Sequence, residues 1–98
     1  MSVVIIGGHD RMVYQYEKIC RGYRCSAKVF TQMSTNMDKK IGCPDLLVLF
    51  TNTVSHKMVR CALEEAKRSN ARVVRCHTSS KSALTDILER EVAAGESV

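Results

Sequence analysis

The sequence has few aromatic residues and lacks the long apolar runs of a membrane protein. Three tyrosines and two phenylalanines are its only aromatic residues, and most fall at positions expected for a core. No aromatic platform that could stack on bases is therefore expected. No apolar run approaches the roughly 20 residues of a membrane span, and the start of the chain lacks the basic flank of a signal peptide. The expected compartment is the cytoplasm.

The cysteines do not have the spacing of a zinc site. They are odd in number, no two are separated by two residues, and a reducing compartment favours small buried hydrophobes over disulfides. These residues are Cys20, Cys25, Cys43, Cys61 and Cys76.

Acidic residues are outnumbered by basic ones, 10 to 15, which gives a net charge of +5. This excess indicates an anionic partner, although most of it is expected to be solvated surface charge. Nucleic acid is not the expected partner, because no recognised nucleic-acid motif accompanies the charge. With 98 residues, 45% hydrophobic and 26% charged, the chain is expected to form one domain over residues 1–98, with a frayed tail over 93–98.

Two fully apolar runs predict strands that are buried on both faces of a parallel sheet. One is Leu46–Phe50, leading into Thr51, and the other is Ser2–Ile6. A helix is the alternative for so short a run, but Pro44 before the first run favours a strand. Cys25–Thr31 alternates roughly and predicts a half-exposed edge strand, on which Lys28 would discourage edge pairing. A last strand is predicted over Ala71–Cys76.

Helical spacing of apolar residues follows each predicted strand. The first helix begins near Met12 and should stop at Gly22. A short helix is predicted within Gln32–Ile41, with Met33, Met37 and Ile41 on one face and Gly42 at its end. A third helix is predicted over about Val54–Ser69, with Thr53 or a neighbour as N-cap and Asn70 as C-cap. Its expected buried residues are Val59, Ala62, Leu63 and Ala66, and those of the last helix are Leu84, Ile87, Leu88 and Val92.

The pattern βαβαβαβα predicts a small, doubly wound α/β fold with four parallel strands, of Rossmann-like or flavodoxin-like type. The expected strand order is 2-1-3-4, with the switch point between the first and third strands.

All three histidines fall in connections that leave the carboxyl edge of this predicted sheet. His9 follows the first strand, His56 the third and His77 the fourth. His56 is the strongest candidate, because a rigid buried strand precedes it. His9 has an alternative interpretation as a helix cap, and His77 as the polar end of an edge strand. Neutral imidazoles at such an edge can bind a metal.

The same edge is also expected to favour an anion. A basic residue accompanies each histidine, namely Arg11, Lys57 and Lys81, and helix N-termini point there. The glycines of the Gly7-Gly8 turn allow a close approach to a ligand. Hydroxyl groups come from Ser55, Thr78, Ser79 and Ser80.

Several enzyme and nucleotide-binding chemistries are disfavoured. After Gly7-Gly8 there is no third glycine for a dinucleotide fingerprint, and Thr31-Gln32 stands where an acidic residue would hold a ribose. No P-loop is present. The strand ending in Phe50-Thr51 lacks the acceptor aspartate of a receiver domain. No set of nucleophile, base and orienting residue can be assembled, so an enzyme is the weakest of the functional hypotheses.

These residues carry a resemblance to a small bacterial family. The Gly7-Gly8 turn with Arg11 and a nearby tyrosine, the Val54-Ser55-His56 step and the late Ser79-Ser80 resemble a domain of unknown function that is also called "domain related to iron". The resemblance extends over nearly the whole chain. It implies haem binding through histidine and regulation of iron-linked or respiration-linked partners. One departure from the family pattern is Phe30-Thr31-Gln32-Met33, where histidines and a glycine pair would be expected.

Carried over, the resemblance implies a haem-binding sensor or regulatory module, with haem b as cofactor. His56 is the expected metal ligand, with His9 or His77 as a second one. The residues expected to line the cofactor are Gly7, Gly8, Arg11, Ser55, Lys57, Ser79 and Ser80. A homodimer and a regulated protein partner are expected as well. The alternative hypothesis is a non-catalytic module for a nucleotide, another phosphate compound or a metal ion.

Overall fold

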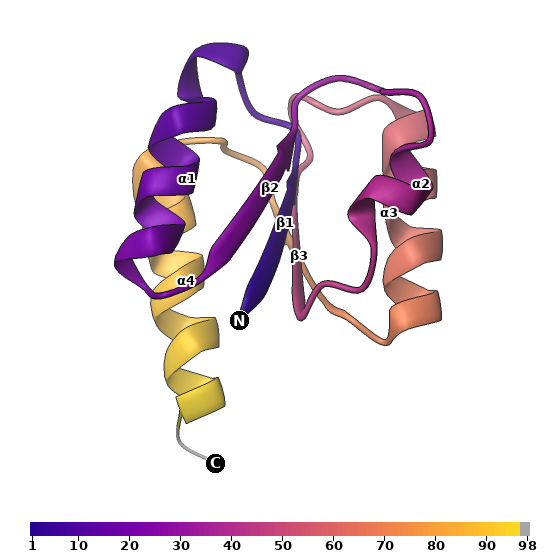
Figure 1. Cartoon of the computed structure of the whole chain (residues 1–98). Helices are drawn as coiled ribbons and strands as arrows, with labels where there is room; N and C mark the ends of the chain where they lie inside the picture. The colour runs from indigo at the N-terminus through magenta and orange to yellow at the C-terminus, as the bar shows by residue number, and fades with distance from the viewer. Residues whose placement is uncertain (97–98) are drawn as a thin grey trace.

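Four parallel strands form one sheet with helices on both of its faces (Figure 1). The computed structural model describes the backbone of residues 1–96 and the side chains of residues 1–92. The strands are β1 (Ser2–Ile6), β2 (Ser26–Phe30), β3 (Leu46–Phe50) and β4 (Arg72–Cys76). Their order, β2-β1-β3-β4, confirms the prediction, as does the parallel pairing of every neighbouring pair.

The two fully apolar strands lie at the centre of the sheet. Every residue of β3 is buried, and so are the last four residues of β1. Ile5 of β1 is in register with Val29 of β2 and Val48 of β3, and Val48 is in register with Val74 of β4. The edge strands β2 and β4 contain only exposed and half-buried residues, because each has a neighbour on one side alone.

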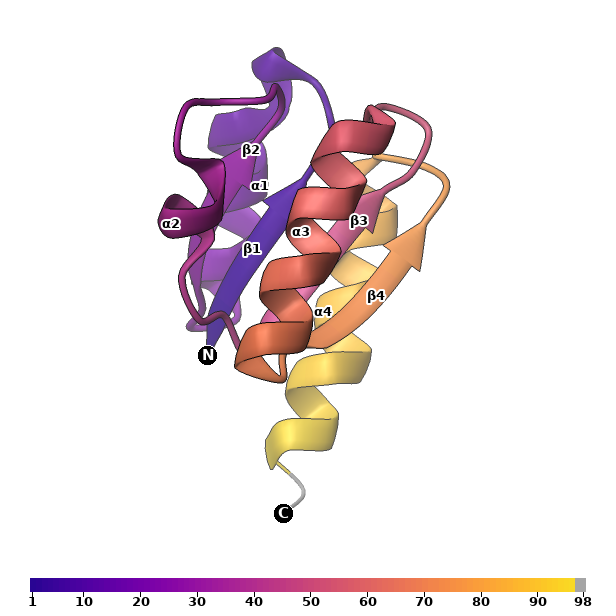
Figure 2. The same cartoon turned by 90° about the vertical axis from the view of Figure 1, so that its right-hand side faces the viewer.

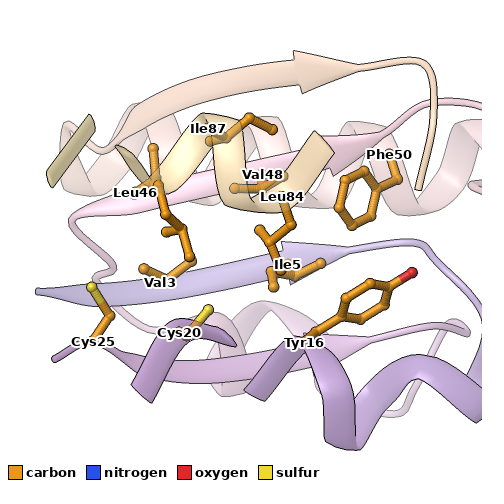
Figure 3. Packing of buried hydrophobic residues seen from close by; sticks show 11 residues of the cluster. Val3, Ile5, Tyr16, Cys20, Cys25, Leu46, Val48, Phe50, Leu84 and Ile87 are labelled. Carbon is orange, nitrogen blue, oxygen red and sulfur yellow. The ribbon is translucent and has the colours of Figure 1, made fainter. Parts of the chain in front are cut away.

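Alternate residues of the central strands enter two separate cores. One core lies under α1 (Val13–Gly22), which follows the short 3₁₀ turn η1 (Asp10–Met12), and under α4 (Lys81–Glu96). Figure 3 shows this core, with the Tyr16 ring beside Phe50. The other lies under α2 (Met37–Ile41) and α3 (His56–Ser69), which face the viewer side by side in Figure 2. Its buried members are Val4, Ile6, Met37, Ile41, Leu47, Leu49, Met58, Ala62 and Ala66.

Helix α2 is shorter than the sequence predicts. It spans Met37–Ile41 instead of most of Gln32–Ile41, and Gly42 ends it with φ of 65°. Met37 and Ile41 are buried, but Met33 lies before the helix and is 43% exposed, so its predicted place on the same face is wrong. Lys28 of the edge strand donates from Nζ to the carbonyl oxygen of Lys40 at 3.0 Å, close to the end of α2.

Helix α3 has the predicted C-cap, Asn70, in a left-handed conformation. Its buried face is rotated slightly from the predicted one. Ala62 and Ala66 are buried as expected, together with Met58 and Glu65, whereas Val59 and Leu63 are only half-buried. In α1, Gly22 is the last helical residue, and the left-handed residue beyond it is Arg24 with φ of 59°.

Helix α4 continues to Glu96, so residues 93–96 are helical where a frayed tail was expected, and residues 97–98 lie outside the described residues. Leu84, Ile87 and Leu88 are buried, and Val92 packs against the same core. In the part of the chain that the structure describes, no helix has the length and apolarity to cross a membrane.

The cysteines follow their predicted role as small buried hydrophobes only in part. Cys20 and Cys25 are buried, Cys61 and Cys76 are half-buried, and Cys43 is exposed, all of them as free thiols.

Candidate functional site

The connections that carry the histidines leave the carboxyl edge of the sheet, at the upper end of the strands in Figure 1. We call this region the rim: residues 7–12, 51–57 and 77–81. His9 precedes η1, His56 is the first residue of α3, and His77 follows β4 directly. All three side chains are exposed. The rim therefore brings the histidines to one edge of the sheet, as predicted, without burying any of them.

His56 lies at a helix start that a side chain caps, whereas His9 precedes a 3₁₀ turn without such a cap. The preceding residue, Ser55, is the N-cap of α3, and its hydroxyl oxygen accepts from the Met58 backbone N–H at 3.2 Å. The strand before this turn, β3, is buried along its whole length. A capped helix start next to a buried strand holds the backbone of His56 in a defined position.

The crevice between β1 and β3, where folds of this kind often bind ligands, is closed by the protein itself. The Gly8 N–H donates to Thr53 Oγ1 at 2.7 Å and so joins the two loops. A Cβ atom on Gly7, which has φ of +104°, would lie 2.7 Å from Val54 Cγ1 and 2.9 Å from the Phe50 carbonyl oxygen. A ligand at this edge must therefore lie on the loops and not between the strands.

The glycine pair also packs against Tyr16 on the other side. Gly8 has φ of +88°, and a Cβ there would lie 2.6 Å from Tyr16 Cε2. Tyr16 is fully buried, its ring centroid lies 5.5 Å from that of Phe50, and its hydroxyl donates to the Ser79 carbonyl oxygen at 2.6 Å. The close approach that we expected the glycines to offer a ligand is thus made by the protein's own side chains.

Two serine hydroxyls of the rim have structural partners. Ser55 caps α3, and Ser80 accepts from the Ala83 N–H at 3.1 Å at the start of α4. Each hydroxyl keeps its own proton for a further hydrogen bond. Ser79 contributes its carbonyl oxygen to the contact with Tyr16, and its side chain is half-buried.

The charge of the rim is mainly positive. Arg11, Lys57 and Lys81 are exposed, and within the described residues none of them forms an ion pair. The carboxylate of Asp10 accepts from Thr31 Oγ1 and, at 3.1 Å, from Gln32 Nε2. Hydrogen bonds therefore occupy the main acidic group of the rim and fasten the end of β2 to η1.

Two shallow depressions adjoin this region. One of ≈ 500 Å³ is lined by His9, Asp10, Arg11 and Met12. The other, of ≈ 530 Å³, lies at the end of β2 and has Asp10, Phe30 and Met33 among its lining residues. His56 and His77 line neither of them. The structure therefore places His9 and Arg11 in the same hollow, which His56 does not line.

No set of three His, Cys, Asp or Glu side chains among the described residues is close enough together to hold a metal ion. The three histidines of one chain thus do not make a shared metal site. Three of the five cysteines are poor substitutes, because burial raises the pKa of the Cys20 thiol to about 12 and also raises the pKa of the Cys25 and Cys61 thiols. These three thiols stay protonated near neutral pH, whereas metal binding needs the thiolate.

Sequence reasoning missed two residues that shape the rim. Tyr16 was assigned by number to the apolar face of its helix, and the tyrosine near the glycine turn had no role beyond the resemblance. Thr53 or a neighbour was expected as the N-cap, a role that Ser55 performs. A tyrosine eight residues after a glycine pair is consistent with the packing observed, but the sequence does not specify it. The Thr53 contact joins residues that are 45 positions apart, and no local pattern indicates it.

Comparison with known proteins gives a family but no function. The family model described as "Uncharacterized protein conserved in bacteria (DUF2325)" matches residues 2–91. This match runs from the start of β1 into α4 and contains all four strands and all three histidines. No curated protein and no solved structure gives a match.

Proposed function

The chain belongs to this family of uncharacterized bacterial proteins, and we propose that it acts as a haem-binding sensor or regulatory module without catalysis of its own. The haem iron is bound by His56, and the ligand lies on the rim. The module acts by controlling a protein partner. A cytoplasmic location is part of this proposal, because five free cysteines suit a reducing compartment.

The observation that carries the proposal is the setting of His56. Its side chain is exposed, its backbone is fixed by the capped start of α3, and β3 beneath it is fully buried. An axial ligand must hold its imidazole in one orientation against the iron, which requires a backbone that does not move. His9 precedes a 3₁₀ turn that has no side-chain cap, and His77 follows an edge strand, so neither has the support that the capped start of α3 gives to His56.

The charges of the rim suit the carboxylates of haem. A haem carries two propionates, and the exposed Arg11 and Lys57 are available to pair with them. The N-terminus of the 14-residue helix α3 adds unpaired backbone N–H groups beside His56. Haem would supply the redox-active or gas-binding iron, while the chain's own residues supply orientation and charge.

One chain offers only part of the apolar enclosure that a macrocycle needs. Val54 and Met12 are half-buried, Met33 is 43% exposed, and Met37 is too deeply buried to contact a ligand. The glycine pair leaves no slot, because Val54 and Tyr16 fill the space on either side of it. We therefore propose a homodimer that encloses the haem between two rims. The second axial histidine is His9 or His77 of the same chain, or a histidine of the second subunit.

A second candidate is a non-catalytic module that binds a nucleotide or another phosphate compound. The observation in its favour is that the rim has three exposed cations, while its acidic residue Asp10 is engaged by Thr31 and Gln32. In this case the histidines donate hydrogen bonds to phosphate oxygens and no metal is involved. A metal ion alone has less support, because no three metal-binding side chains of the described residues lie together.

An absorption spectrum of the purified full chain, before and after addition of haem, tests the proposal. We expect a sharp, saturable Soret band with the shape of histidine-ligated haem, accompanied by a change from monomer to dimer in sedimentation. Addition of ATP or inorganic phosphate at equal concentration should not displace the haem. A spectrum that stays like that of free haem, together with binding of the phosphate compound, would favour the second candidate.

A further inference from the structure

The edge strand β4 has unpaired backbone groups along its outer side. β4 pairs with β3 alone and forms one border of the sheet, beside α3 in Figure 2. The Arg72 N–H donates to the Asp45 carbonyl oxygen at 3.1 Å, and the Cys76 carbonyl oxygen accepts from the Thr51 N–H at 2.8 Å. In a parallel strand the residues alternate, so Arg72, Val74 and Cys76 point toward β3. The N–H and carbonyl groups of Val73 and Arg75 therefore point outward.

A groove runs along the same border, between β4 and α3. It has a volume of ≈ 520 Å³, and its apolar lining comes from Leu63, Ala66, Ala71 and Val73. Lys67 of α3 and Arg75 of β4 supply cations to the lining, and both residues are exposed. Val73 and Arg75 thus contribute both outward backbone groups and side chains to this one surface, which we call the β4 groove.

The charge of the β4 groove favours an acidic occupant over a second copy of the chain. None of the described residues that line it is acidic. The nearby carboxylate of Glu91 pairs with Arg72. Adjacent residues of a strand point to opposite faces, so this ion pair lies on the face opposite to Val73 and the groove. A symmetric dimer through β4 would bring the same patch against itself, and thus Lys67 and Arg75 of one copy against those of the other. An occupant with acidic side chains avoids this repulsion, because its carboxylates pair with both Lys67 and Arg75.

We propose that the β4 groove binds an extended acidic segment of a partner protein, which adds to the sheet as a fifth strand beside β4. The segment pairs its backbone with Val73 and Arg75. Its alternate side chains face the groove, an apolar one over Val73 and an acidic one beside Arg75 and Lys67. This inference does not rest on haem binding, since the groove lies on the α3 side of the sheet border and contains none of the histidines.

The test uses the full chain without haem and two capped nine-residue peptides. In the first peptide, every second residue is threonine, and the positions between them are glutamate or valine. One face of the extended peptide therefore carries all the glutamates and valines, and the other face carries the threonines. In the second, lysine replaces each glutamate. Amide chemical shifts and hydrogen exchange are recorded at low salt for the ¹⁵N-labelled protein. The opposite edge strand, β2, serves as an internal control through Ala27 and Val29, the residues expected to point outward there.

We expect the glutamate peptide to shift the Val73 and Arg75 amides and to slow their exchange, while Ala27 and Val29 stay unchanged. The lysine peptide should have no effect. Charge reversal by Lys67→Glu with Arg75→Glu should weaken binding by at least about tenfold. Arg75→Lys should keep most of the affinity. Arg75→Pro should abolish the protection of Val73 while leaving β3–β4 pairing intact, because the lost N–H points away from β3.

Three results would overturn the proposal. The first is equal binding of the lysine peptide, which would mean that charge does not select the occupant. The second is unaltered exchange at Val73 and Arg75 in the presence of bound glutamate peptide. The third is protection of these two amides in the peptide-free protein in step with dimer formation, which would assign the border of the sheet to a second copy. Failure of the protein to bind haem in a separate titration would disprove the proposed function and leave this inference untouched.

Discussion

Substituting Gly8 by alanine tests whether the glycine pair is required by the fold itself. Gly8 has φ of +88°, a conformation that costs an L-residue about 1–3 kcal/mol. The new Cβ would lie 2.6 Å from Tyr16 Cε2 and 2.8 Å from the Tyr16 hydroxyl oxygen. Tyr16 has no easy way to move, because it is fully buried and bonded to the Ser79 carbonyl oxygen. Overpacking of this kind adds about 1–3 kcal/mol.

The free energy of unfolding should therefore fall by about 2–6 kcal/mol in Gly8→Ala, a large part of the 5–15 kcal/mol that is typical of a domain. In a domain of this size each kcal/mol lowers Tm by about 4–8 °C. Urea unfolding followed by circular dichroism, together with a thermal scan, measures both quantities.

Gly22→Ala is the matched control for this experiment. Gly22 ends α1 without a positive φ, and nothing lies within 4 Å of a Cβ placed there. The control should be neutral or more stable by up to about 1 kcal/mol, since alanine favours a helix. If Gly8→Ala proved as stable as Gly22→Ala, the packing of the glycine pair against Tyr16 would be refuted, and the pair would be free to contact a ligand.

Three further predictions follow from the rim and the core. Arg11→Ala with Lys57→Ala should weaken haem binding, more strongly at low salt, where charge attraction is least screened; equal affinity at low ionic strength would mean that these cations are only solvated surface. Tyr16→Phe should lower the free energy of unfolding by about 1–2 kcal/mol in urea titrations, because it leaves the Ser79 carbonyl oxygen without its donor; an unchanged value would contradict that bond. Burial raises the pKa of Cys20 from 9.0 to about 12, so the stability that the protonated thiol contributes is complete below pH 9 and is lost between about pH 9 and 12. Cys20→Ala should reduce the fall in the free energy of unfolding over this pH range, and an equal fall in both proteins would contradict the burial of this thiol.

The sheet could be predicted from the sequence because its central strands have no polar face. Leu46–Phe50 and the apolar part of Ser2–Ile6 must be covered on both sides, and helices after each strand are the only covering that the sequence provides. The two buried strands take the centre of the sheet and the half-exposed strands take its edges, and short connections of one hand then favour the order 2-1-3-4. The extent of α2 was less predictable. The four-residue spacing of Met33, Met37 and Ile41 fits a helix of two turns, but the spacing of Met37 and Ile41 alone fits the single turn that forms.

The candidate site could be predicted only at the level of which loops meet. The parallel sheet alone places His9, His56 and His77 at one edge. Whether the crevice there is open depends on Thr53 and Val54 meeting the glycine pair, contacts between residues far apart in sequence. Two residues of the N-cap type compete at the start of α3, and only the structure shows that Ser55 caps the helix.

The most direct test of the proposed function is a haem titration of His56→Ala, with His9→Ala and His77→Ala measured in parallel. His56 is exposed on the rim, so its loss should leave the far-ultraviolet circular dichroism and the Tm unchanged. Haem binding through this imidazole predicts that the Soret band of His56→Ala is lost or shifted and its affinity reduced. The other two variants should show smaller and graded effects. A Soret band and affinity in His56→Ala equal to those of the unmodified chain would contradict the account and move the iron ligand to another residue.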